Sequence, residues 1–81
     1  MVLEEIKYTT NGLISALFDK KDKPKTLTIE ISNDYEKESL QVTIEECGNK
    51  IAELLYQNNR RFNLLKILND KKEVIHTIDI I

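Results

Sequence analysis

Residues 26–32 alternate strictly between polar and apolar side chains, in the order Thr-Leu-Thr-Ile-Glu-Ile-Ser. Successive side chains of a strand point to opposite faces, so this alternation is typical of a strand with one buried face. It predicts that Leu27, Ile29 and Ile31 point inward. Such a strand needs neighbours in a sheet and a layer over its apolar face, which constrains the chain to a sheet-containing fold.

A second strand is predicted a short distance downstream. Residues 40–42 read Leu-Gln-Val and alternate again, after a polar connection at residues 33–38. A connection of about six residues is close to the usual length for a hairpin. We therefore predict that residues 26–32 and 40–42 pair antiparallel.

The N-terminal segment contains the dipeptide Asn11-Gly12 between two apolar stretches. Residues 5–9 alternate like a strand, and Asn-Gly supplies the positive φ angles that a two-residue hairpin turn requires. We therefore predict a hairpin with its second strand at residues 13–18. A helix capped by Asn11 is the alternative for residues 13–18, because four apolar residues lie at helical spacing there: Leu13, Ile14, Leu17 and Phe18.

One amphipathic helix is predicted over residues 43–58. Apolar residues recur there at steps of three and four, which places them on one stripe: Ile44, Cys47, Ile51, Leu54 and Leu55. Thr43 and Glu46 have the spacing of a capping box, which starts a helix. Glycine is unfavourable in a helix interior. Either the helix therefore starts at Asn49, or Gly48 allows a close approach to the sheet.

Two further strands are predicted at residues 62–68 and 73–80, joined by residues 69–72. Both faces of this hairpin carry apolar residues: Phe62, Leu64 and Leu68 oppose Leu65 and Ile67, while Val74, Ile78 and Ile80 oppose Ile75 and Ile81. One amphipathic helix cannot cover both faces. We therefore expect a second layer of strands, a curled sheet or another chain on the remaining face.

Together these elements define the expected fold. A chain of 81 residues has room for one domain, so residues 1–81 are expected to form a single domain. The expected fold class is α+β, with a mostly antiparallel sheet in the order β-β-β-β-α-β-β and the amphipathic helix packed on one face.

The chain contains no recognisable catalytic or cofactor-binding motif. It has one cysteine, one histidine and two glycines, too few for a histidine- and cysteine-rich metal site or a glycine-rich phosphate loop. Cys47 lies on the apolar helix stripe, where a free cysteine is typically a small core residue. His76 alternates with Val74 and Ile78, which predicts a packed or half-exposed strand residue. We therefore expect a non-enzymatic protein without a metal or cofactor.

Three features bear on the compartment. A single cysteine cannot form an internal disulfide, the first residues lack the pattern of a signal peptide, and no stretch approaches about 18 consecutive apolar residues. We therefore expect a cytoplasmic protein without a membrane span.

The charge of the chain argues against a general nucleic-acid binder. The formal net charge is −2, whereas such binders carry a basic surface. The two arginines, Arg60 and Arg61, follow the predicted helix, where its dipole favours positive charge. Single-stranded nucleic-acid binding through Arg60, Arg61 and nearby lysines, beside exposed aromatic residues, is the alternative function.

The two-sided C-terminal hairpin favours protein binding as the function. Its last strand has no charged tail to protect the edge, and such an edge pairs with a second copy or with a strand of another protein. We expect a homodimer, an adaptor or an inhibitor, of the kind that a phage or other mobile element encodes against a host protein. Alternatively, these apolar residues fill the centre of a small barrel or sandwich. The predicted contact residues are Arg60, Arg61, Phe62, Ile75, Ile78, Ile80 and Ile81.

Overall fold

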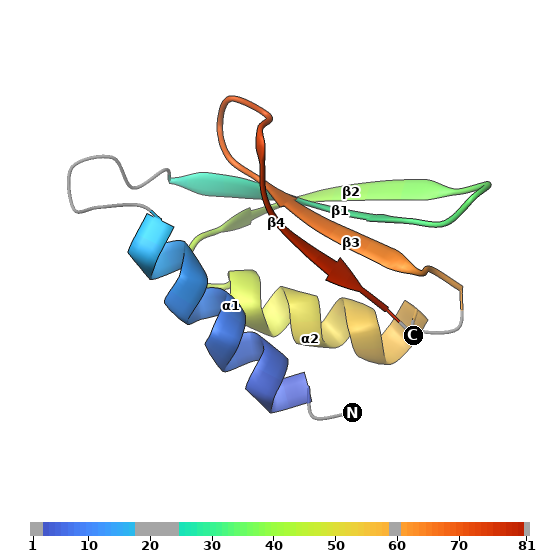
Figure 1. The fold of residues 1–81 in the computed structure, drawn as a ribbon, viewed down its shortest axis with the longest axis horizontal. Coiled ribbons are helices and arrows are strands. Elements are labelled where there is room, and N and C mark those ends of the chain that lie inside the picture. Colours follow the sequence, from blue (N-terminus) through green and yellow to red (C-terminus); the bar gives the residue numbers. More distant parts are fainter. Residues whose placement is uncertain (1–2, 18–24, 59–60, 81) are drawn as a thin grey trace.

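The computed structural model describes residues 3–17, 25–58 and 61–80 of the chain (Figure 1). Its elements follow in the order α1 (Leu3–Leu17), β1 (Thr26–Ser32), β2 (Lys37–Thr43), α2 (Cys47–Asn58), β3 (Leu64–Leu68) and β4 (Val74–Asp79). The four strands form one antiparallel sheet in the order β2-β1-β3-β4. Both helices lie on the same side of this sheet (Figure 1). The α+β class and the antiparallel sheet are therefore confirmed.

The core lies between the sheet and the helices. The three residues predicted to point inward from β1, Leu27, Ile29 and Ile31, are each at most 1% exposed. Directly opposite residues of antiparallel strands share a face, so Leu65 and Ile67 of β3 lie on the same inner face as β1's apolar residues. The helices add Ile14, Cys47, Ile51 and Leu55 to the same core. Central strands β1 and β3 thus carry the best-buried part of the molecule.

The N-terminal hairpin predicted from the Asn-Gly pair is wrong, because residues 3–17 form the continuous helix α1. The strand predicted at residues 5–9 is helical, and Gly12 has no positive φ angle. Ile6, Thr10 and Ile14 recur every four residues and are half-buried or buried, and α1 packs against α2. Burial of this stripe overrides the local preference of the turn.

The alternative prediction, a helix at residues 13–18, is right as far as Leu17, where α1 ends. Asn11, however, lies inside the helix and does not cap it. Phe18, the last residue of that alternative, lies outside the described residues. The element order therefore begins with one helix where two strands were expected, and the remaining order, β-β-α-β-β, agrees with the prediction.

Helix α2 begins through the predicted capping box. The backbone N–H of Thr43 donates to Oε1 of Glu46 over 2.9 Å, and the N–H of Glu46 donates to Oγ1 of Thr43 over 3.3 Å. Residues 44–46 form a turn, so the regular helix starts at Cys47. Gly48 therefore lies inside the helix. The close approach that it permits is to α1, and the expectation of an approach to the sheet is wrong: an added Cβ would lie 2.6 Å from Nδ2 of Asn11.

The predicted C-terminal hairpin forms, but its strands are shorter than residues 62–68 and 73–80 and its pairing has one irregularity. Its turn places Lys72 at a φ angle of 62°, and the register of β3 and β4 shifts between Ile67 and Leu68. This bulge moves Val74 to the outer face opposite Leu68, while His76 and Ile78 lie on the inner face opposite Ile67 and Leu65. The helices cover the inner face. Among the described residues, no element covers the outer face.

Candidate functional site

Arg61 is tied to the hairpin of β1 and β2 by charge. Its guanidinium Nε pairs with the carboxylate of Glu36, and Nη2 lies 3.7 Å from Oε1 of Glu38. Pairing with Arg61 lowers the pKa of Glu36, and Glu36 raises the pKa of Arg61 in return. Asn33 strengthens the link, because its side-chain amide donates to the carbonyl of Arg61. This cluster fastens the entry of β3 to the loop at residues 33–36.

Phe62 follows directly and belongs to the core. Its side chain is 2% exposed, and the guanidinium carbon of Arg61 lies 5.1 Å from the centre of its ring. Arg60 lies outside the described residues. Of the three adjacent residues predicted to contact a partner, only Arg61 is therefore shown at the surface, and there it already contacts two carboxylates.

Two of the predicted contact residues, Ile75 and Ile78, lie on β4, which is an edge strand. Among the described residues, β4 pairs only with β3, so its other side presents unpaired backbone N–H and C=O groups. Ile75 and Ile78 are half-buried, whereas Ile80 is 5% exposed and packs in the core. Ile81 lies outside the described residues. The edge therefore offers Ile75 and Ile78, while Ile80 supports the strand from within.

Each edge strand carries charge at one end, Lys37 and Glu38 on β2 and Asp79 on β4, but only β2 has a charged side chain on the inner face. Glu38 faces this inner side opposite Ile31. Charged residues on an edge strand, and charges pointing inward above all, discourage pairing with another chain. Residues 74–78 of β4 contain no acidic residue, lysine or arginine, and burial lowers the pKa of His76, which favours its neutral form. β4 is thus the edge with fewer obstacles to pairing.

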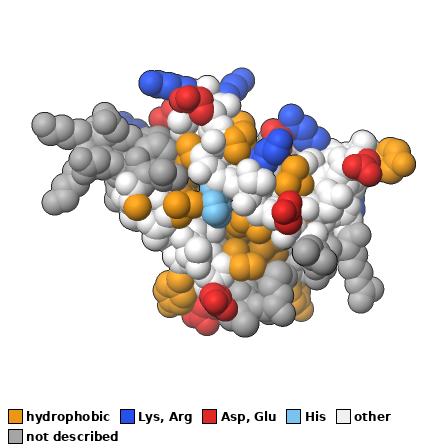
Figure 2. Space-filling model, viewed as in Figure 1, with side chains coloured by type: hydrophobic (Ala, Val, Ile, Leu, Met, Phe, Trp, Pro, Cys, Tyr) orange, Lys and Arg blue, Asp and Glu red, His pale blue; other side chains and the backbone are white. Residues whose placement is uncertain are grey.

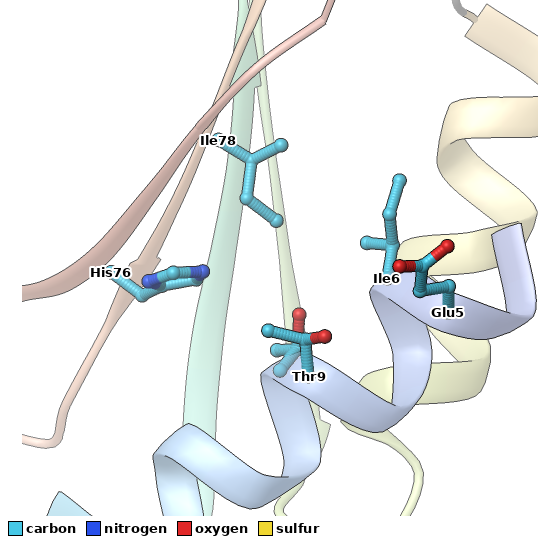
Figure 3. Close-up of a pocket in the computed structure, with 6 residues that line it drawn as sticks. Glu5, Ile6, Thr9, His76 and Ile78 are labelled. Carbon is cyan, nitrogen blue, oxygen red and sulfur yellow. The ribbon is translucent and has the colours of Figure 1, made fainter. Parts of the chain in front are cut away.

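A pocket of about 210 Å³ lies beside this edge, between β4 and α1 (Figure 3). His76 and Ile78 enter it from β4, and Glu5, Ile6 and Thr9 face them from α1 (Figure 3). Thr10 completes the lining. Figure 2 shows the single histidine at the molecular surface, with hydrophobic side chains around it. The pocket therefore opens on the same face of the molecule as the β4 edge.

Thr10 is the unusual member of this lining. Its side chain is 1% exposed, and no hydrogen-bond partner for its Oγ1 lies among the described residues. Buried hydroxyl groups nearly always have a partner. Thr10 therefore holds an unused donor and acceptor that is buried beneath the surface of the pocket.

The α1 half of this pocket was missed from sequence because residues 5–9 were interpreted as a strand. The four-residue spacing of Ile6, Thr10 and Ile14 was the available signal for a helix. His76 is half-buried, as predicted. Cys47 is fully buried as predicted, and burial raises the pKa of its thiol to about 11, which makes it a poor nucleophile at neutral pH.

Other classes of site find no support in the described part of the chain. It contains no group of three or more histidine, cysteine or carboxylate side chains that could hold a metal ion. None of its helices is both long and apolar enough to span a membrane. On the outer face of the sheet, Lys37 pairs with Glu30 over 3.1 Å, so this lysine does not contribute an uncompensated positive charge there.

Comparison of the chain with protein-family models, with curated proteins and with solved structures finds no significant match.

Proposed function

We propose that this domain is a non-enzymatic protein-binding module whose contact surface is the edge of β4 with the adjoining pocket. The observation that carries the proposal is the position of β4: it is an edge strand free of acidic residues, lysine and arginine from Val74 to Ile78, and a pocket adjoins its inner face. An extended segment added to such an edge gains backbone hydrogen bonds, and its alternate side chains reach the inner face.

The bulge near the hairpin turn does not remove this opportunity. It shifts the register only between Ile67 and Leu68, and the pairing of residues 76–79 with β3 is regular. The regular part of β4 is therefore where a partner strand has the best geometry. Val74, at 50% exposed, adds an apolar side chain on the outer face of the same edge.

Two kinds of partner fit this edge, a second copy of the chain and a strand of another protein. A second copy would pair through a two-fold axis and make association depend on protein concentration. Light scattering coupled to size exclusion, at two concentrations a hundredfold apart, separates these cases. A monomer at both concentrations would exclude the homodimer and leave an adaptor or inhibitor of another protein.

Capture of partners from a cell lysate tests the surface directly. Ile75→Asp places a charge on the half-buried side chain at the β4 edge, and we expect it to abolish capture. Leu40→Asp is the matched control on the other edge strand, because Leu40 is 39% exposed on β2. It should leave capture unchanged.

Both variants must be checked for native structure by circular dichroism. If Ile75→Asp unfolds the chain, Val74→Asp replaces it, since Val74 is more exposed. Capture that survives both β4 variants, or that is lost equally with Leu40→Asp, would refute the proposed surface. The positions predicted earlier at Ile78 and Ile80 are less suitable, because Ile80 is buried and Ile78 lines the pocket.

Single-stranded nucleic-acid binding is the alternative function. Glu36 and Glu38 already engage Arg61, and the exposed aromatic residues Tyr8, Tyr35 and Tyr56 lie on three different segments. Base stacking along a strand needs aromatic and basic groups on one shared surface. Capture that nuclease treatment abolishes and that falls steeply with salt would favour this alternative.

A further inference from the structure

We propose that the pocket between α1 and β4 binds an aliphatic ammonium group, supplied by a lysine side chain of the segment that pairs with β4. This inference rests on the proposed function, since the lysine arrives on the added strand. The pocket itself, however, can be tested without any protein partner.

The lining combines apolar walls with groups that accept hydrogen bonds. Ile6 and Ile78 suit the methylene groups of a lysine side chain. The hydroxyls of Thr9 and Thr10 each have lone pairs, and an ammonium group has three N–H donors and no acceptor. The buried Oγ1 of Thr10 has no partner among the described residues, and rotation of this side chain to another rotamer would turn the hydroxyl toward the pocket, where an ammonium N–H would satisfy it.

Charge selects a cation over a neutral or anionic group. Glu5 is the lining residue with a formal charge, and it makes no salt bridge within the described part of the chain. Burial lowers the pKa of His76, so near neutral pH its ring is uncharged and offers one nitrogen as an acceptor. A positive group would thus find one carboxylate and no positively charged side chain among the lining residues.

A strand that pairs with β4 would direct some of its side chains toward the pocket. Every second side chain of a strand paired with β4 points to the inner face, on the side where His76, Ile78 and α1 form the pocket (Figure 3). In a two-fold pairing of β4 with a second copy, the inward side chains of that copy would again be His76 and Ile78. Neither side chain carries an ammonium group, so a lysine in the pocket would come from a different protein.

The pocket is tested first with n-butylammonium chloride, titrated into the ¹⁵N-labelled protein at low salt and pH 7.5. We expect saturable shifts of the amide signals of Thr9, Thr10, His76 and Ile78, and much smaller shifts with 1-butanol, which has the same chain without the charge. Equal responses to both compounds, or none to butylammonium, would overturn the proposal.

Two adjacent carboxylates provide a matched pair of variants. Glu5 lines the pocket, whereas Glu4 is exposed and does not. Glu5→Gln should weaken butylammonium binding at least fivefold, and Glu4→Gln less than twofold. Equal weakening by the two substitutions would show that only the general field of the helix end attracts the cation.

Thr10→Val tests the unpartnered hydroxyl with a side chain of nearly the same shape. We expect weaker butylammonium binding together with a higher melting temperature, because the substitution removes a buried polar group that has no partner. Thr9→Val, at an exposed position of the same helix, is the control and should not raise the melting temperature. A lower melting temperature for Thr10→Val would mean that its hydroxyl is already satisfied within the fold and would overturn its assigned role.

Delivery by a strand is tested with a capped heptapeptide, Thr-Val-Thr-Lys-Thr-Val-Thr, and its twin with norleucine in place of lysine. The lysine peptide should bind at least tenfold more tightly and should shift signals along β4 as well as in the pocket. Butylammonium binding without preference for the lysine peptide would retain the pocket and refute delivery by a strand. Failure of the proposed function is seen separately, in the lysate experiment with Ile75→Asp.

The pH dependence provides an independent readout. His76 faces Glu5 and Thr9 of α1 across the pocket and lies opposite Ile67 of β3. As the pH falls through the lowered pKa of His76, the ring becomes positive and repels the ammonium group. Binding should therefore weaken more steeply on acidification in the wild type than in a His76→Gln variant. The same pH profile in both proteins would exclude His76 from the site.

Discussion

At the scale of single residues, Arg61 illustrates how a surface charge acquires a structural role. The sequence places it just after a helix, where the dipole favours positive charge. In the structure it pairs with Glu36 and Glu38, about 25 positions earlier in the chain, and covers the ring of Phe62. All three charged side chains are 45–53% exposed, so the cluster orders the surface more than it stabilises the fold.

Arg61→Ala should raise the pKa of Glu36 toward its ordinary value, because the guanidinium that stabilises its charged form is gone. Carboxyl NMR titration measures this directly. A carboxyl group whose pKa is lower in the folded state stabilises the fold above its unfolded pKa, and this contribution is lost as the pH falls through the lowered value. The acid-induced loss of stability should therefore be smaller in Arg61→Ala than in the wild type.

Arg61→Lys serves as the control, since it retains the charge but not the planar fork of donors. It should give an intermediate pKa for Glu36. An unchanged pKa of Glu36 in Arg61→Ala would show that the pair does not form in solution.

At the scale of elements, α1 shows a tertiary contact overriding a local turn signal. Asn11-Gly12 is a strong hairpin signal by itself, yet it lies inside a helix whose stripe of Ile6, Thr10 and Ile14 is turned toward the rest of the fold. Gly48 of α2 is one reason why this segment packs as a helix. An added Cβ there would lie 2.6 Å from Nδ2 of Asn11 and 2.8 Å from Cγ of Lys7, so the missing side chain lets the helices approach closely.

Substituting the two glycines separately tests this arrangement. Gly12→Ala should stabilise the domain by about 1 kcal/mol, because alanine favours a helix and no atom lies within 4 Å of the added Cβ. Gly48→Ala should destabilise it by about 1 kcal/mol. Overpacking costs about 1–3 kcal/mol, which exceeds the gain of about 1 kcal/mol in helix propensity. Urea unfolding measures both effects.

Asn11→Ala provides the test of the mechanism, because it removes the atoms that the new Cβ would meet. In a double-mutant cycle, Gly48→Ala should cost less in the Asn11→Ala background than in the wild type. Destabilisation by Gly12→Ala would instead indicate a positive φ angle at Gly12 and support the hairpin.

At the scale of the whole molecule, the strand order decides which parts are protected from solvent. β1 and β3 are central, and their inward residues are at most 1% exposed, whereas β2 and β4 are edges. Helix α2 packs on β1 and β2, and α1 packs chiefly on α2, which places α1 at the periphery. An 81-residue chain buries only about 60–65% of its surface on folding, so a small core must hold all of these layers.

Native-state hydrogen exchange should therefore be slowest for the central amides of β1 and β3, faster in α2, and fastest in α1 and along the outer edge of β4. Peripheral elements open locally at a lower free energy than central ones. Two-dimensional NMR after transfer to deuterium oxide measures this order. Protection of α1 equal to that of β1 would mean that the helix folds and unfolds only with the whole core.

The sequence by itself determined the features that depend on residues a few positions apart. Alternation predicted β1 and β2 and their antiparallel pairing, and the two-sided apolar segments at the C-terminus predicted the hairpin of β3 and β4. The three- and four-residue steps predicted α2, and Thr43 with Glu46 predicted its capping box. It also identified the apolar β4 side of the candidate site. Period and capping are local properties, which is why the chain alone was sufficient there.

Only the tertiary structure decided the features that join distant segments. Four features depend on contacts between such segments: the helical state of residues 3–17, the helix that Gly48 approaches, the carboxylates around Arg61, and the bulge that places Val74 on the outer face. The pocket is the clearest case, since Thr10 and His76 are 66 positions apart and meet only when α1 lies beside β4. Burial free energy depends on what an element packs against, and short-range sequence patterns do not contain that information.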